Sequence, residues 1–179
     1  MKNILLVAML CIIVVQTTLL ALPTPAHSKD NFCLSDDGVK FLTEHEGVVY
    51  KIYNDIAGYP TGGIGHKLSK KENLQYNVGD KIDEATTISW FVEDVREACA
   101  AIDFYVKVPL TINEKDAIVS FIYNIGNEAF AESTFLRELN RKQYLSASRE
   151  FTRWIWAGGK RSKGLLNRRL SEQELFRKK

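Results

Sequence analysis

The spacing of apolar residues changes several times along the chain, and each change predicts a different element. Val39 and Leu42 are spaced as on one face of a helix, which Ser35 can begin as a capping residue and Gly47 can end. From residue 48 the β-branched and aromatic stretch V-V-Y-K-I-Y predicts a strand, and T-G-G-I-G predicts its return after the turn N-D-I-A-G-Y-P. The pattern therefore predicts a helix up to residue 46 and a hairpin over residues 48–66.

The rest of the chain has helical spacing almost throughout. Asp83 can cap a long helix near residues 84–103, and Pro109 cannot continue it. The next helix begins at Thr111 or Asn113, and its predicted core positions are Ile118, Val119, Phe121, Ile122 and Ile125. Two amphipathic helices follow, S-T-F-L-R-E-L-N-R and Y-L-S-A-S-R-E-F-T-R-W-I-W, and after a break at G-G-K comes a last helix, G-L-L-N-R-R-L-S-E-Q-E-L-F. The predicted fold class is α+β and mainly helical, with a small lobe that carries the hairpin and a helical lobe.

The first 28 residues have the pattern of an export signal. Lys2 precedes an apolar run over residues 4–15, and the small residues Ala26 and Ser28 end the segment, so we predict a signal peptide over 1–28 that is cleaved near residues 26 to 28. An uncleaved anchor is the alternative, because residues 4–22 are just long enough to span a bilayer. In either case residues 29–179 have the length of one domain, and this domain is exported.

The charged residues are unevenly distributed along the chain. The formal net charge is only +2, from 24 Lys and Arg against 22 Asp and Glu. Residues 29–136 carry 10 basic and 18 acidic residues, a net charge of −8, whereas residues 137–179 carry 13 basic and 4 acidic residues, a net charge of +9. A basic face suits an anionic polymer, either bacterial cell wall or nucleic acid, and the export signal disfavours nucleic acid. A solvated helical surface is the alternative explanation for most of these residues.

The chain has three cysteines, Cys11, Cys33 and Cys99. Cys11 would leave with a cleaved signal, so the exported chain would retain an even pair for which a disulfide is permitted. Sequence spacing does not place Cys33 and Cys99 within bridging distance, so a disulfide and two free thiols both remain open. A catalytic thiol is disfavoured, because neither residue lies in the motif of a nucleophile.

Two carboxyl groups near the predicted hairpin have contrasting surroundings. Glu46 falls at the C-terminus of the first helix, where the negative end of the helix dipole favours a protonated carboxyl group. Asp55 falls in a more polar turn and is expected to stay ionised. A carboxyl pair with such a contrast is what glycoside hydrolysis requires. Solvated surface residues would show the same spacing, so spacing alone does not decide between the two explanations.

The motif around these carboxyl groups resembles that of the phage-type lysozymes, or endolysins. It has the form E-G-x7-D-x5-T-x-G-x-G-H and consists here of Glu46, Gly47, Asp55, Thr61, Gly63, Gly65 and His66. Two later segments, Y-N-I-G-N and G-L-L-N-R-R-L-S-E-Q-E-L-F, also resemble the family, and the resemblance spans roughly residues 34–176. One departure is Pro60, which constrains the turn before Thr61 and is expected to be tolerated there.

The resemblance implies a two-lobed lysozyme fold with a long helix between the lobes. It also implies a muramidase that cuts the β-1,4 bond between N-acetylmuramic acid and N-acetylglucosamine in peptidoglycan. Glu46 would donate a proton to the glycosidic oxygen, and Asp55, assisted by Thr61, would orient and deprotonate a water. Asn124 would face the sugar, unless it is only a helix cap, and His66 would contact substrate or hold the hairpin by a hydrogen bond. We expect no cofactor, no metal ion, no nucleic-acid partner, a monomer, and transient membrane contact through the N-terminal segment.

Three rival functions are disfavoured by the same residues. A module that only binds peptidoglycan would be favoured by the loss of Glu46 or Asp55, and both are present. A lytic transglycosylase typically works with one acid and no water base, which Asp55 and Thr61 argue against. A zinc amidase needs several His or Cys ligands, whereas outside the signal the only histidines are His45 and His66. The tryptophans are expected to pack in the core, with stacking on sugars as the alternative: Trp90, Trp154 and Trp156.

Overall fold

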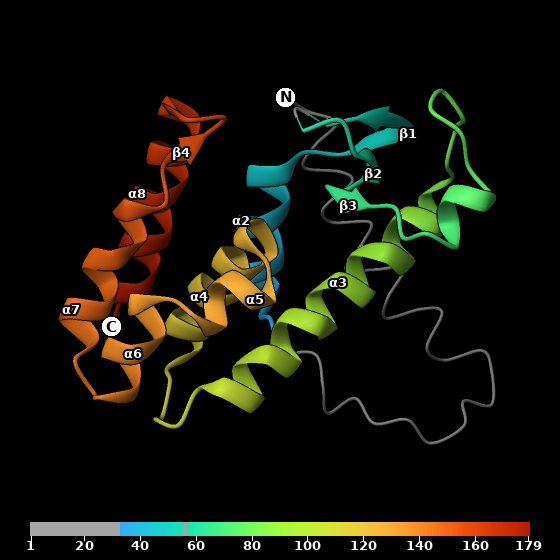
Figure 1. Ribbon diagram of the computed structural model, residues 1–179. Coiled ribbons are helices and arrows are strands. Elements are labelled where there is room, and N and C mark those ends of the chain that lie inside the picture. The colour runs from blue at the N-terminus through green and yellow to red at the C-terminus, as the bar shows by residue number, and fades with distance from the viewer. Residues whose placement is uncertain (1–32, 56) are drawn as a thin grey trace, which may run out of the picture. The chain divides into compact units, whose positions relative to one another are not determined.

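The computed structural model describes residues 33–55 and 57–179, and the predicted signal peptide or anchor lies outside them. The described residues divide into two compact units. The first unit contains residues 39–94, and the second contains the residues up to 38 together with residues 95–179. Two helices, α2 (Asp36–Glu46) and α3 (Glu84–Tyr105), contribute residues to both units (Figure 1). Within the described ranges, no helix is both long enough and apolar enough to cross a membrane.

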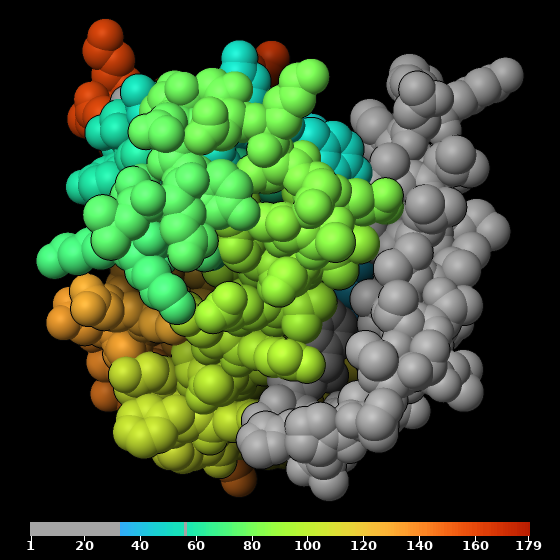
Figure 2. Space-filling model, turned by 90° about the vertical axis from the view of Figure 1, so that its right-hand side faces the viewer, coloured from blue at the N-terminus to red at the C-terminus, as the bar shows by residue number. Residues whose placement is uncertain are grey.

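The first unit contains a three-stranded antiparallel sheet in the order β1 (Val49–Asn54), β2 (Pro60–Gly63) and β3 (His66–Lys67). The predicted hairpin of β1 and β2 is confirmed, and β3 is an additional strand. Tyr53 on β1 pairs with Thr61 on β2, which in turn pairs with Lys67 on β3. The three side chains are therefore neighbours across one face of the sheet. After β3 comes the 3-10 helix η2 (Glu72–Leu74), and Figure 2 shows the segment between β3 and α3, drawn in green, on the molecular surface.

Gly62 lets the sheet pack closely on its core. A methyl group at this position would lie 2.8 Å from Cδ1 of Ile52 and 3.1 Å from Cδ1 of Ile82. These two side chains form a buried cluster with Leu68 and Trp90. A glycine at this position therefore lets the side chains of the cluster approach the backbone of β2 closely.

The second unit consists of helices around an aromatic core. α4 (Ile112–Ile125) packs against α8 (Lys163–Arg177), and α5 (Asn127–Ala131), α6 (Thr134–Asn140) and α7 (Tyr144–Glu150) complete the unit (Figure 1). The core contains five buried phenylalanine rings whose contacting centroids lie between 4.8 and 6.1 Å apart: Phe121, Phe130, Phe135, Phe151 and Phe176. The mainly helical α+β class predicted from the sequence is confirmed.

The predicted helix boundaries are confirmed at two side-chain caps. Asp83 accepts a hydrogen bond from the N–H of Thr86 at 2.7 Å, at the start of α3. Thr111, rather than Asn113, caps α4 and forms a capping box with Glu114. The predicted core positions on α4 are buried except for Ile125, which is only half-buried because it is the last residue of the helix.

The prediction that a helix continues through W-I-W is wrong. α7 ends at Glu150, the 3-10 helix η3 (Phe151–Arg153) follows, and the chain then forms a hairpin of β4 (Trp156–Ala157) and β5 (Lys160–Arg161). Gly158 and Gly159 have φ angles of +54° and +75°, the left-handed conformation that a two-residue hairpin turn requires. The G-G pair, which the sequence predicted only as a break between helices, therefore forms the turn of a hairpin.

The basic face predicted for residues 137–179 needs a correction, because two of its arginines are buried. Arg168 and Arg169 each place Nε next to a carboxylate oxygen of Glu172, at 3.0 Å and 2.8 Å. Ser120 of α4 donates its hydroxyl to Glu172 at 2.8 Å, and its carbonyl oxygen accepts from Arg168 at 3.0 Å. Burial raises the pKa of Glu172, and the two guanidinium groups oppose the rise. These arginines therefore join α8 to α4 and do not contribute to a charged surface.

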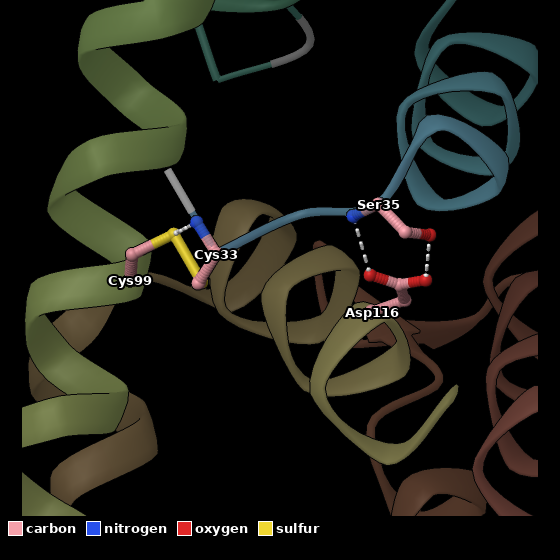
Figure 3. The surroundings of a disulfide bond; sticks show 4 residues. All are labelled: Cys33, Ser35, Cys99 and Asp116. Atoms are coloured by element: carbon pink, nitrogen blue, oxygen red, sulfur yellow. Dashed lines mark hydrogen bonds between the residues drawn. A yellow bond between two sulfur atoms is a disulfide. The ribbon is translucent and has the colours of Figure 1, made fainter. Parts of the chain in front are cut away.

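The segment before α2 is fixed at two points (Figure 3). Cys33 and Cys99 form a disulfide with their Cα atoms 5.7 Å apart, which decides between the two states that the sequence left open. The backbone N–H of Ser35 donates to Oδ1 of Asp116 at 3.0 Å, and the Ser35 hydroxyl donates to Oδ2. The same hydroxyl caps α2 by accepting from the N–H of Gly38 at 3.0 Å. The start of α2 is therefore held to both α3 and α4.

Candidate active site

Glu46 is the last residue of α2, as predicted. Gly47, which follows it, has a φ angle of +71°, and its N–H donates to the carbonyl oxygen of Thr43 at 3.0 Å. A glycine in the left-handed conformation is a common way to end a helix. The side chain of Glu46 is half-buried, so the turn after α2 presents a carboxyl group that is only partly in contact with solvent.

Asp55 lies in the turn between β1 and β2. Its Oδ1 accepts hydrogen bonds from the N–H groups of Tyr59 at 2.8 Å and Ala57 at 2.9 Å, and its Oδ2 lies 3.7 Å from Nζ of Lys67. The bond from Tyr59 lowers the pKa of Asp55 below its ordinary value, the bond from Ala57 and the charge of Lys67 act in the same direction, and desolvation opposes them. Asp55 is therefore held as an anion, as predicted, with 21% of its side chain exposed.

Thr61 is buried on β2 and connects to Asp55 through the backbone of Tyr59. The Thr61 hydroxyl donates to the carbonyl oxygen of Tyr59 at 3.0 Å, and the N–H of Asp55 donates to the same oxygen at 2.9 Å. Pro60 is the first residue of β2 and pairs with Asn54. The first position of a strand tolerates proline, so Pro60 leaves the hairpin intact, as expected.

Tyr53 is a site residue to which no sequence motif pointed. Burial raises the pKa of its hydroxyl, and the negative charges of Glu46 and Asp55 raise it further. The available signal was the strand pattern of V-V-Y-K-I-Y, which ends at Tyr53, two positions before Asp55. Tyr53 therefore stands beside Thr61 across the two strands and two positions before Asp55.

His66 is a buried residue of β3 whose two ring nitrogens both face carboxylates. Nδ1 lies 2.9 Å from Asp94, Nε2 lies 3.2 Å from Glu72, and the ring stacks on Trp90 with a centroid distance of 4.6 Å. Burial lowers the pKa of His66, but the two carboxylates outweigh it, so the pKa lies above the ordinary value of 6.5. These bonds join β3 to α3 and η2, and both predicted roles of His66, in holding the hairpin and in contacting substrate, stay predictions.

The other candidate residues have different surroundings. Asn124 is exposed in the last turn of α4, in the second unit, and Gly126 rather than Asn124 is the C-cap of that helix. Its contact with sugar stays a prediction. Trp90 is buried and Trp154 is half-buried, but Trp156 is 61% exposed, so the prediction of core packing is wrong for Trp156. In the described part of the chain, no group of three or more His, Cys, Asp or Glu residues could hold a metal ion.

Comparison with known protein families tests whether the chain is related to the phage-type lysozymes. The family model described as "Phage lysozyme" matches residues 43–172, a range that includes Glu46, Asp55 and Thr61. The chain belongs to the phage lysozyme family. This lysozyme is 40% identical over 147 residues to the "Endolysin" of Acyrthosiphon pisum secondary endosymbiont phage 1, a match that covers 80% of this chain and 97% of the relative. It is 37% identical over 135 residues to the "SAR-endolysin" of Escherichia phage Mu, and this match covers 75% of each chain.

A solved structure agrees with the family in its fold. The lysozyme resembles the crystal structure of a P22 lysozyme mutant with a TM-score of 0.65 and 37% sequence identity, over 80% of this chain and 97% of that one. The protein is accordingly a glycosidase of the lysozyme type, an endolysin that hydrolyses bacterial peptidoglycan.

Proposed function

We propose that Glu46 is the general acid and Asp55 the general base in an inverting hydrolysis of the bond between N-acetylmuramic acid and N-acetylglucosamine. The observation that supports this assignment is that Glu46 ends α2 and Asp55 lies in the hairpin turn with two backbone N–H donors, at the two carboxyl positions of the motif within the matched family range. Asp55 is held ionised by two backbone N–H groups and by Lys67. Glu46 is half-buried at the end of α2, at the position that the motif assigns to the acid. Asp55 is therefore suited to accept a proton, and Glu46 takes the role of proton donor from its place in the motif.

The nucleophile in this proposal is a water bound between Asp55 and Thr61. Asp55 accepts one proton of the water. The Thr61 hydroxyl donates its own proton to the carbonyl oxygen of Tyr59, so its oxygen can accept the second proton of the water. Two acceptors orient the water so that a lone pair can point at the anomeric carbon, while Glu46 protonates the leaving oxygen. Inversion requires that the two carboxyl groups leave room for this water.

The assignment of the acid is tested with Glu46→Gln, which keeps the shape of the side chain and removes the proton to be donated. Lysis of purified cell walls should fall by about 10²–10⁴-fold, because general acid catalysis contributes that much. Glu44→Gln is the matched control, since Glu44 is an exposed residue of the same helix. A folded Glu46→Gln protein that releases reducing sugars at the parental rate would refute the assignment.

The assignment of the base is tested with Asp55→Asn, which should also reduce activity by about 10²–10⁴-fold because the water then lacks its base. The control is Asp80→Asn, in which an exposed carboxylate that accepts a bond from Asn77 N–H is changed instead. Mass analysis of the released sugars adds a second readout. Hydrolysis consumes one water for each bond that is cut and leaves a reducing end, whereas a transglycosylase consumes no water and forms an anhydro sugar. Anhydro products would contradict the role of Asp55.

We also propose that residues 1–28 direct export and that this segment brings the chain into contact with the membrane. The apolar run over residues 4–15 supports the proposal, as does the similarity to a relative named "SAR-endolysin". Sequencing of the amino terminus of the exported protein is the test. A start near Lys29 indicates a cleaved signal, and a start at Met1 in active membrane-bound protein indicates an anchor. Protein that stays in the cytoplasm would contradict both forms of the proposal.

A further inference from the structure

The exposure of Trp156 needs a physical explanation. An indole left in water forfeits most of the burial energy that an aromatic side chain contributes to a core. Trp156 is 61% exposed, although Ile155, its neighbour in the chain, is 5% exposed and belongs to the core. The backbone therefore enters the core at Ile155 and then directs the largest side chain of the hairpin outward.

The hairpin presents Trp156 together with a cation in a fixed arrangement. Trp156 pairs directly with Arg161 across the two strands, and the guanidinium carbon lies 5.8 Å from the centroid of the indole ring. The base of the hairpin is anchored at both ends, because Ser162 donates its N–H to the carbonyl oxygen of Ile155 at 2.8 Å and its hydroxyl caps α8. A guanidinium stacked on a ring keeps its N–H edges available, so it can still bind a carboxylate. The pair is thus pre-organised and needs little ordering when a ligand binds.

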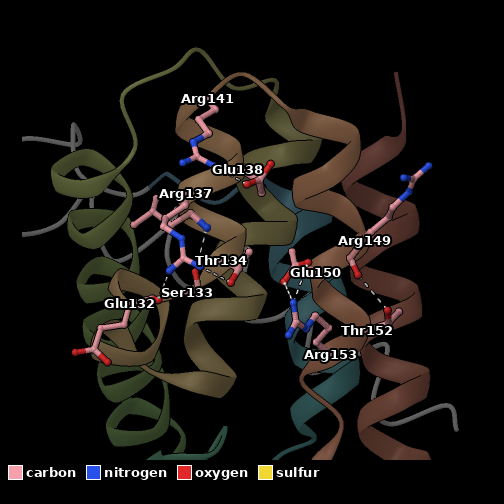
Figure 4. Close-up of polar contacts among 11 residues, drawn as sticks. Glu132, Ser133, Thr134, Arg137, Glu138, Arg141, Arg149, Glu150, Thr152 and Arg153 are labelled. Atoms are coloured by element: carbon pink, nitrogen blue, oxygen red, sulfur yellow. Dashed lines mark hydrogen bonds and ion pairs between the residues drawn. The ribbon is translucent and has the colours of Figure 1, made fainter.

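The charges around this hairpin differ from those on the neighbouring helices. At the C-terminal ends of α6 and α7, Arg141 pairs with Glu138 at 3.1 Å and Arg153 of η3 pairs with Glu150 at 3.1 Å, and Figure 4 shows these local pairs. Residues 151–171 contain no Asp or Glu at all. Within residues 33–55 and 57–179, no carboxylate forms an ion pair with the exposed hairpin cations Lys160 and Arg161 or with Lys163 at the start of α8. Three exposed cations therefore lie within or next to the hairpin, in a stretch of sequence without a carboxylate.

We propose that residues 156–163, here called the hairpin platform, form an auxiliary binding site for the peptidoglycan strand. The C–H face of an N-acetyl sugar packs on the open part of the Trp156 indole, and a carboxylate of the stem peptide pairs with Arg161, Lys160 or Lys163. This inference rests on the peptidoglycan substrate and is independent of which residues perform the cleavage. A second contact on one polymer raises the effective concentration of the substrate at the catalytic residues, so its loss matters most on a large, insoluble wall.

The test is co-sedimentation with purified sacculi, after a brief incubation on ice, in the Glu46→Gln background. Trp156→Ala should weaken binding by roughly tenfold, as is common when an aromatic side chain that a ligand covers is truncated, and Trp156→Tyr should restore most of the binding. The matched control is Phe104→Ala. Phe104 is 70% exposed and has Lys107 Nζ 5.6 Å from its ring centroid, the same kind of pair, but it follows Asp103 in the chain. Binding by Phe104→Ala should stay within about twofold of the background.

The chemistry of the ligand is tested with sacculi whose carboxylates have been converted to amides. The parental platform should bind these sacculi several-fold more weakly, and the difference should disappear in a variant that combines Arg161→Gln with Lys160→Gln and Lys163→Gln. Parental binding by Trp156→Ala, or an equal loss in Phe104→Ala, would overturn the proposal. Unchanged binding to amidated sacculi would overturn the role of the cations. Release of sugars by the background during the assay would refute the role of Glu46 and leave the comparison between platform variants intact.

Discussion

Removal of the Cys33–Cys99 disulfide tests how strongly the start of α2 is held in the folded lysozyme. The bridge joins residues 66 positions apart. A cross-link lowers the conformational entropy of the unfolded chain, and closing a loop of this length stabilises the folded state by about 4 kcal/mol at 25 °C in the chain-entropy description. The double substitution Cys33→Ala with Cys99→Ala should therefore lower the free energy of unfolding by about 4 kcal/mol. For a domain of this size the melting temperature should fall by about 8–16 °C.

Urea denaturation and calorimetry measure this change, and both proteins should carry Cys11→Ser so that no third thiol can exchange with the bridge. Adding a reductant should destabilise the parental protein by nearly as much as the double substitution and should leave the double variant unchanged. A loss below about 1 kcal/mol would refute the reasoning, since loop closure would then contribute far less than chain entropy predicts. In that case the bonds between Ser35 and Asp116 would be sufficient to hold the segment.

Three further predictions concern charged side chains. The pKa of His66 is raised above 6.5 and that of Glu72 is lowered below 4.5, so their ion pair is complete between these values. His66→Gln should lower the free energy of unfolding most between pH 4.5 and 6.5, and the loss should become smaller as the pH rises through the folded pKa of His66. Urea titrations at several pH values measure this loss, and a loss that does not depend on pH would contradict the prediction. Glu172→Gln leaves two buried arginines without their carboxylate and should cost about 3–5 kcal/mol in the same assay, and a neutral effect would argue against the ion pairs. Lys67→Met removes a cation beside Asp55, so the pKa of Asp55 should rise and the acidic limb of the pH profile of kcat/KM should move to higher pH. An acidic limb that stays in place would show that the backbone N–H groups alone hold Asp55 ionised.

The features that could be predicted from the sequence depend on nearby residues. Gly47 ends α2 through its own left-handed backbone, and Asp83 and Thr111 begin helices through bonds that span only three residues. The ionised state of Asp55 follows the same rule, because its N–H donors lie within four positions of it. Hydrogen bonds and backbone conformations of this local kind can be predicted from the sequence before any tertiary contact is known.

The features that could not be predicted depend on residues far apart in the chain. His66 meets Asp94 across 28 positions, and nothing in the spacing indicates this contact. A count of charges treats every arginine as exposed, whereas Arg168 and Arg169 are buried against a helix 48 positions earlier. The spacing of Ile155 and its apolar neighbours fits a helix as well as a strand. The sequence pattern therefore does not predict the hairpin that exposes Trp156.

The bonds of Ser35 also constrain the order in which the chain can fold. Asp116 follows Ser35 by 81 positions, and Cys99 follows Cys33 by 66. A chain that emerges from the ribosome amino terminus first therefore exposes α2 long before α3 and α4 exist as partners. During that interval only local bonds, such as the Ser35 cap on Gly38, can support a helix of 11 residues, which is marginal by itself in water. The helix that ends in Glu46 is thus complete in the growing chain before the residues that hold its start have been synthesised.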